Sequence, residues 1–220
     1  MHTEIVGKPS FGYINVDLEP GETLVAESDA MASMSADLSM QAKFNGGLFS
    51  ALGKKFLGRE SLFVNEFCNN RAKAQRVTLA QRTPGDICSI ELNDETFYLQ
   101  PGAYIASTSG VDLDLGWAGF ASFIGREGLF RLKVKGTGTV WFGAYGGVLE
   151  RDLAGEIIVD TSHLVGYSPG IGLSATLAGG IFSSFFGGEG LVTRLEGQGK
   201  YYIQTRSIAG LAGWLNPKIV

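Results

Sequence analysis

The chain has 220 residues, of which 45% are hydrophobic and 18% charged, a composition that supports a sizeable core and excludes intrinsic disorder. Its net charge of −4 lacks the basic footprint of a dedicated nucleic-acid-binding protein, so we expect no nucleic-acid partner. The two cysteines form no CxxC motif and no secretory signal precedes them, which predicts reduced thiols and a cytoplasmic location.

The charges are unevenly distributed along the chain. Residues 1–42 carry a net charge of −6, residues 43–82 carry +6, and residues 83–220 carry −4. The basic segment either faces an anionic partner or forms a solvated surface, and solvated surface is the commoner use of such a segment.

Alternating apolar and polar residues predict half-buried strands over residues 14–18, 111–115 and 129–135. The best helix candidate is the short stretch 48–57, which has apolar residues at helical spacing. Residues 164–186 hold no charged residue, but their proline and glycines favour short strands and turns over a membrane-spanning helix.

A six-residue motif that begins with glycine and has glutamate in third place occurs three times, with its glutamates at Glu60, Glu127 and Glu189. The second and third copies are followed by glycine pairs around residues 136–138 and 197–199. In the first copy, Asn69-Asn70-Arg71-Ala72 takes the place of that pair. We expect a repeated hairpin of strand, glycine turn and strand, with each glutamate accepting backbone N–H bonds where a strand begins.

An apolar segment rich in glycine and phenylalanine lies just before each motif, at residues 46–53, 116–124 and 178–186. Such segments either pack in an interface or face a membrane or a protein partner. The candidate residues of these segments and of the lysine pair beside the first are Phe49, Lys54, Lys55, Trp117, Phe120, Phe123, Phe182, Phe185 and Phe186.

The glutamate motif, the glycine pairs and the apolar segments together resemble the mitochondrial-biogenesis (altered inheritance of mitochondria) family and its bacterial branch, over about residues 11–214. The resemblance implies three tandem barrels of the tryptophan-RNA-binding-attenuation-protein type, each a short double-stranded β-helix. It also implies a homotrimer whose nine units form a ring. Eukaryotic relatives are linked to mitochondrial inner-membrane organisation, which suggests a membrane association. The family supplies no catalytic motif and no cofactor to carry over.

Residues that carry chemistry in other proteins are sparse and scattered here. The two histidines, His2 and His163, are far apart in sequence, whereas a metal site needs clustered ligands. No Gly-x-Ser-x-Gly motif and no phosphate-binding loop is present. Cys68 lies in an apolar run without a paired base, which favours a core position over a nucleophile. We therefore expect no catalytic, metal-binding or cofactor-binding residues.

These observations predict an all-β fold of three tandem units, at residues 1–95 with a basic insertion, 96–152, and 153–220 with a C-terminal tail. The function they favour is a non-enzymatic oligomeric scaffold, or a membrane-associated assembly factor peripheral to a membrane, with the chain itself as its main partner. One alternative is a small-ligand-binding protein with sites between units. Its wall residues would be Tyr98, Tyr104, Trp117 and Trp141. An uncharacterised enzyme is the disfavoured alternative.

Overall fold

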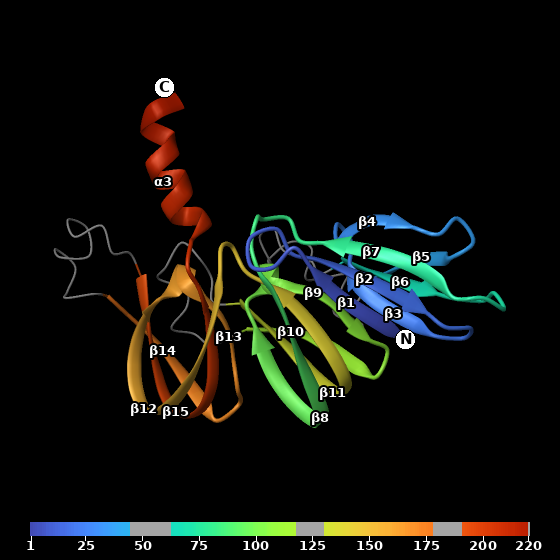
Figure 1. Ribbon diagram of the computed structural model, residues 1–220. Coiled ribbons are helices and arrows are strands. Elements are labelled where there is room, and N and C mark those ends of the chain that lie inside the picture. The colour runs from blue at the N-terminus through green and yellow to red at the C-terminus, as the bar shows by residue number, and fades with distance from the viewer. Residues whose placement is uncertain (45–62, 118–129, 178–190, 220) are drawn as a thin grey trace.

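The computed structural model describes residues 1–44, 63–117, 130–177 and 191–219, and these are mostly β-strand. Three groups of strands lie in a row, and a helix projects from the last of them (Figure 1). The all-β prediction is therefore confirmed. The proposed helix at residues 48–57 lies outside the described residues.

Within the described residues, the group at one end of the row contains seven short strands. They are β1 (His2–Val6), β2 (Tyr13–Leu18), β3 (Thr23–Glu27), β4 (Met31–Met34), β5 (Ser39–Phe44), β6 (Phe63–Cys68) and β7 (Gln75–Ala80).

The other two groups are built from longer strands and match each other closely in length. The middle group contains β8 (Ile87–Leu99), a short 3₁₀ turn, β9 (Tyr104–Thr108), β10 (Val111–Trp117) and β11 (Phe130–Gly143). The last group contains β12 (Val148–Asp160), a second 3₁₀ turn, β13 (Leu164–Tyr167), β14 (Ile171–Leu177), β15 (Leu191–Gln204) and the helix α3 (Ile208–Ile219).

The same pattern of antiparallel pairing occurs in all three groups. In the middle group β11 pairs with β8, β9 and β10, and in the last group β15 pairs with β12, β13 and β14. The first group divides each long strand in two, so that β7 pairs with β2 and β4, while β6 pairs with β3 and β5. The register skips one residue at the corresponding place in β4, β9 and β13. The strands β8 and β12 run through the unit boundaries expected after residues 95 and 152.

The glycine pairs do not form the hairpin turns that the sequence predicted, and this expectation was wrong. Gly136 and Gly138 lie inside the continuous strand β11, and Gly197 and Gly199 lie inside β15. All four have positive φ. A Cβ on Gly136 would lie 2.2 Å from the carbonyl oxygen of Gly110, so the glycine lets one strand bend tightly past a neighbouring turn.

The first copy departs from this pattern as expected, because the residues that replace the glycine pair form a loop between β6 and β7. Asn69 is fully buried there. Its side-chain amide donates to the carbonyl oxygens of Leu18 (2.7 Å) and Lys73 (2.9 Å), and its Oδ1 accepts from the Arg71 N–H (2.9 Å). These bonds hold the loop against the end of β2.

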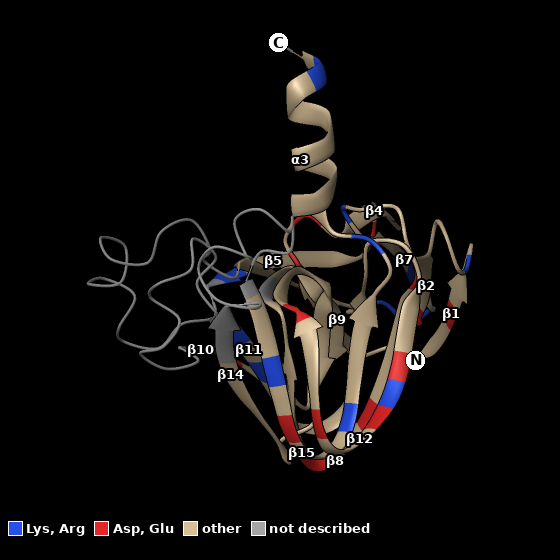
Figure 2. Ribbon diagram, turned by 90° about the vertical axis from the view of Figure 1, so that its left-hand side faces the viewer, with Lys and Arg blue, Asp and Glu red and all other residues tan. Residues whose placement is uncertain are grey.

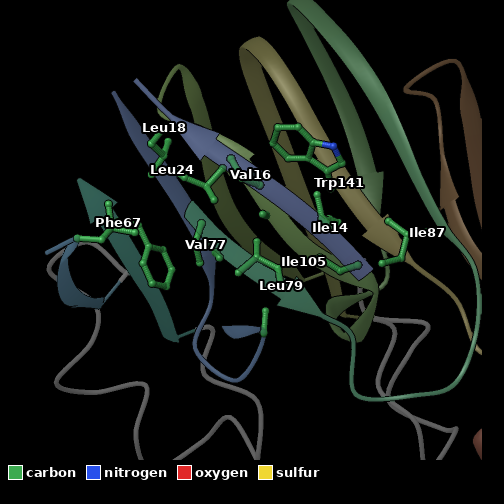
Figure 3. Packing of buried hydrophobic residues seen from close by; sticks show 14 residues of the cluster. Ile14, Val16, Leu18, Leu24, Phe67, Val77, Leu79, Ile87, Ile105 and Trp141 are labelled. Atoms are coloured by element: carbon green, nitrogen blue, oxygen red, sulfur yellow. The ribbon is translucent and has the colours of Figure 1, made fainter. Parts of the chain in front are cut away.

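The hydrophobic core continues from one group into the next. Ile87, Ile105 and Trp141 of the middle group pack with the inward-facing residues of β2, β3 and β7 (Figure 3). A second cluster joins the middle group to Val165 and Tyr202 of the last group. Because the cores are shared, the three groups support one another and form one continuous array.

The helix α3 was not predicted, since residues 208–219 contain Gly210, Gly213 and Pro217, which are unfavourable inside a helix. It stands away from the strands in both views (Figures 1 and 2). In the part of the chain that the structure describes, no helix has the length and apolar character needed to cross a membrane.

Candidate assembly interface

Neighbouring groups in the array are joined at both junctions by strands that occupy corresponding positions in their groups. At the first junction β3 pairs with β9, and at the second β8 pairs with β13. The backbone partners are Val25 with Ser107 and Ala26 with Ala106 at the first junction, and Tyr98 with Tyr167 and Leu99 with Gly166 at the second.

Aromatic stacking reinforces the second junction. The rings of Tyr98 and Tyr167 are stacked with their centroids 5.1 Å apart. The guanidinium of Arg131 lies over the Tyr98 ring, 4.3 Å from its centroid, and donates to the Tyr167 hydroxyl at 3.4 Å. Burial raises the pKa of Tyr167 in spite of that cation. The junction is a packed contact in which the guanidinium of Arg131 lies on the face of Tyr98 and is hydrogen-bonded to Tyr167.

A buried tyrosine supports the first junction. Tyr104 on β9 is fully buried, and its hydroxyl donates to the carbonyl oxygen of Val25 on β3 at 3.2 Å. The same hydroxyl lies 2.9 Å from Oγ of Ser107. Burial raises the pKa of Tyr104, so the hydroxyl stays protonated and able to donate at physiological pH.

The junctions also require a small residue at one position. A Cβ added to Gly166 would lie 2.8 Å from the Phe97 ring and 2.9 Å from the carbonyl oxygen of Tyr98. The corresponding residue of β9 is Ala106, and the corresponding residue of β4 is Ser33, as the matched register shows. All three groups therefore have a small side chain at this position, where a neighbouring strand approaches Ala106 and Gly166 closely.

Among the described strands, β4 and the C-terminal half of β12 occupy these junction positions without a neighbouring group beside them. The strand β4 corresponds to β9 and β13 but pairs only with β7, and β12 corresponds to β8 but pairs only with β15. They lie at opposite ends of the array (Figure 1). Each leaves one row of backbone N–H and C=O groups at a sheet edge.

Burial follows the presence or absence of that neighbour. The strands β9 and β13 are buried almost throughout, whereas Met31, Ala32 and Ser33 of β4 are exposed. On β12, Ile157 and Ile158 are exposed, with 57% of Ile158 accessible, although they correspond to Phe97 and to the stacked Tyr98. The exposed apolar residues are those that a further group would cover.

Neither edge is protected by charge at these positions. Edge strands of soluble proteins commonly carry lysine, proline or inward charges that prevent pairing. The N-terminal half of β12 has Glu150, Arg151 and Asp152, and Glu156 and Asp160 flank the apolar residues Ile157-Ile158-Val159, whereas residues 31–34 are Met-Ala-Ser-Met. The two edges are both apolar and match each other in character.

Sequence reasoning missed Ile157, Ile158 and the β4 residues as candidate functional residues. The signal was present in part, because three consecutive apolar residues at 157–159 interrupt the alternation expected of a half-buried strand. No sequence pattern indicates which edge lacks a partner, since that depends on strand order.

Most residues singled out from the sequence fall outside the described residues. These are the motif glutamates Glu60, Glu127 and Glu189 and the segment residues Phe49, Lys54, Lys55, Phe120, Phe123, Phe182, Phe185 and Phe186. Trp117 ends β10, where its backbone pairs with Phe130.

Three of the four residues expected to line a ligand site have described side chains, and these pack against other residues of the chain. Tyr104 and Trp141 are buried in the core, and Tyr98 forms the stacked junction with Tyr167. His163 Nδ1 lies 2.6 Å from the carbonyl oxygen of Gln204, which ties the second 3₁₀ turn to β15. Cys68 and Cys88 are free thiols, and burial raises the pKa of Cys88. Within the described residues no cluster of metal-ligating side chains is present.

The described arginines of the basic segment pair with the acidic N-terminal segment. Arg71 lies 3.3 Å from Asp37, Arg76 lies 2.7 Å from Asp17, and Arg82 lies within 3.2 Å of Glu27 and Asp29. The uneven charge distribution seen in the sequence is thus partly neutralised when β7 and its flanking loops meet the first strands.

The chain is similar to a known protein family, to a bacterial protein and to a solved structure. A family model described as Mitochondrial biogenesis AIM24 matches residues 3–206. An uncharacterised protein of Streptococcus pyogenes serotype M6 is 27% identical over 214 residues, which cover 93% of this chain and 86% of that protein. The X-ray crystal structure of another Streptococcus pyogenes protein has a TM-score of 0.81 and 26% identity, and the match covers 99% of both chains.

Proposed function

The chain belongs to the Mitochondrial biogenesis AIM24 family, and from this premise we propose that it is a non-enzymatic scaffold that assembles head to tail with copies of itself. Each copy contributes three tandem units, at about residues 13–80, 87–143 and 148–204. In this proposal the units are short double-stranded β-helices of the attenuation-protein type, and the assembly closes into a ring. A trimer is the expected form, because the family resemblance implies it.

The observation that carries the proposal is the exposure of β4 and β12 at positions where their counterparts are buried by a neighbouring group. At both internal junctions the strand that corresponds to β12 pairs with the strand that corresponds to β4. The same pairing between copies would cover both edges of every copy. In an assembly with closed symmetry, neither β4 nor β12 of any copy then remains unpaired on that side.

The internal junctions fix the register of the proposed contact. Val25 faces Ser107 and Tyr98 faces Tyr167, so Ile158 is expected opposite Met34 of the next copy. Ala26 faces Ala106 and Leu99 faces Gly166, so Val159 is expected opposite the small residue Ser33. Complete burial of an exposed isoleucine contributes about 1.5–3 kcal/mol, and because 57% of Ile158 is accessible, covering it contributes roughly half of that. A closed ring gives every copy two such contacts.

Cysteine cross-linking between copies tests this register. In a background with Cys68→Ser and Cys88→Ser, the pair Ser33→Cys with Val159→Cys is expected to form a disulfide between copies on mild oxidation. The matched control is Ser33→Cys with Ile158→Cys, whose side chains would point to opposite faces of the sheet. Multi-angle light scattering of the unmodified protein gives the number of copies. A monomer at micromolar concentration, or equal cross-linking of the two pairs, contradicts the proposal.

A further inference from the structure

We propose that α3 docks the protein onto an anionic lipid surface. The inference rests on the proposed function only for the number of helices that act together. Cyclic symmetry would place every copy of α3 on the same face of the ring, so that the helices meet one membrane at the same time.

The first observation is that α3 is apolar and entirely unburied. None of the residues 208–219 is buried, and Trp214 is 60% exposed. The other large exposed side chains of the helix are Ile208, Leu211, Leu215 and Ile219. These five residues form the longest run of exposed large hydrophobic side chains among the described residues.

The helix also contains residues that destabilise an isolated helix in water. A helix of twelve residues is marginal by itself, and Gly210, Gly213 and Pro217 are unfavourable inside a helix. It contains no salt bridge, and the strands do not cover it. An apolar environment that covers these side chains is therefore needed to keep residues 208–219 helical.

The large apolar side chains of α3 cover one broad face. Ile208, Leu211, Leu215 and Ile219 follow one stripe at helical spacing, and Trp214 lies beside it. A helix with a broad apolar face that carries tryptophan and leucine is suited to the interfacial region of a lipid leaflet. At about 18 Å in length, the helix reaches into one leaflet and does not cross a bilayer.

Charge around the helix favours anionic lipid. Arg206 lies just before α3 and Lys218 lies in its last turn, and residues 197–220 contain no Asp or Glu, although the whole protein has a net charge of −4. The third cation of this stretch, Lys200, lies in β15 and pairs with Glu150. Lys218 is the single charged residue of α3 (Figure 2). Its Nζ lies 4.2 Å from the centroid of the Trp214 ring and donates to the Trp214 carbonyl oxygen at 3.1 Å. Tryptophan and lysine are the side chains that anchor helices at the headgroup level.

Vesicle flotation with the full chain tests the proposal. The vesicles are phosphatidylcholine alone, and phosphatidylcholine with about 30% phosphatidylserine. We expect the protein to float with the anionic vesicles and much less with the neutral ones. The variant Leu211→Ser, Trp214→Ser, Leu215→Ser is expected to lose at least about tenfold in vesicle binding, with its mass and its melting temperature unchanged. The matched control, Phe11→Ser, removes an aromatic side chain that is 73% exposed outside α3 and is expected to bind as the wild type does.

A charge variant tests the lipid preference separately. Arg206→Gln with Lys218→Gln is expected to reduce binding to anionic vesicles by about fivefold per charge and to leave binding to neutral vesicles unchanged.

The possible outcomes separate the two proposals. Wild-type protein that floats with neither vesicle, or a triple variant that falls to a smaller mass, overturns lipid docking, and the smaller mass identifies α3 as a contact between copies. Equal loss of binding in Phe11→Ser also overturns it. A wild-type monomer that still floats retains the docking role of α3 and contradicts the ring alone.

Discussion

The ring of Tyr98 on β8 stacks on the ring of Tyr167 on β13, with centroids 5.1 Å apart, and the two residues are also backbone partners across the junction. Ile158 corresponds to Tyr98 at the far end of the array, but no residue of the described chain takes the place of Tyr167 there. One copy thus contains two internal examples of the contact that we propose between copies.

Charge at the exposed edge is expected to prevent assembly. Ile158→Lys places an ammonium group where the side chain of the next copy would pack, and an unpaired buried charge is costly. We expect the protein to become monomeric in light scattering with an unchanged circular dichroism spectrum. Phe11→Lys, at an exposed aromatic residue away from both edges, is the control and is expected to keep the wild-type mass.

The bends inside β11 and β15 are expected to depend on glycine. Gly136→Ala and Gly197→Ala each place a Cβ 2.2 Å from a carbonyl oxygen at a backbone φ of +135° and +129°. Each change is expected to cost about 1–3 kcal/mol from backbone strain, before any clash is counted. Urea denaturation measures the loss. Gly102→Ala, where a Cβ meets nothing within 4 Å, is the control, and a similar loss there would contradict this explanation.

The buried amide of Asn69 is expected to hold the loop between β6 and β7. Asn69→Ala leaves the carbonyl oxygens of Leu18 and Lys73 without this donor, at a cost of about 1–3 kcal/mol for buried groups left unpaired. Chemical denaturation is the measurement. Asn70→Ala changes an exposed neighbour and is expected to have little effect, so equal losses at the two positions would show that the amide bonds are not the cause.

The Asp17–Arg76 pair is expected to make stability depend on pH. Arg76 donates two hydrogen bonds of 2.7 Å to the carboxylate, and these hold the pKa of Asp17 below its usual value. Because the folded pKa is lowered, the stabilisation is present above the unfolded pKa of about 3.9 and is lost as the pH falls through the folded pKa. We expect Asp17→Asn to lower the melting temperature at pH 7, and the difference from the wild type to shrink below about pH 3. A difference that is constant with pH contradicts the assignment.

Local sequence pattern predicted the strands well where one face is buried. Tyr13–Leu18 has the alternating burial that its residues 14–18 indicated, and residues 111–115 lie within β10. The family resemblance was confirmed by the match over residues 3–206. The glycine pairs were misinterpreted, because glycine with positive φ serves a hairpin turn and a bend inside a long strand equally well. The pairing of β11 along its whole length with β8, β9 and β10 is what identifies the glycines as a bend inside a strand and not as a hairpin turn.

The sequence by itself determined that this is an all-β protein of the family, because period-two alternation and glycine placement are local properties of the chain. The tertiary structure alone decided which of three corresponding strands is covered. Tyr104 on β9, Leu164 on β13 and Met31 on β4 stand at matching positions, yet the first two are buried and Met31 is exposed. The physical reason is that burial of a strand depends on the strand that lies beside it. The strand β4 belongs to the group at the end of the array, and among the described residues it has no neighbouring group beside it.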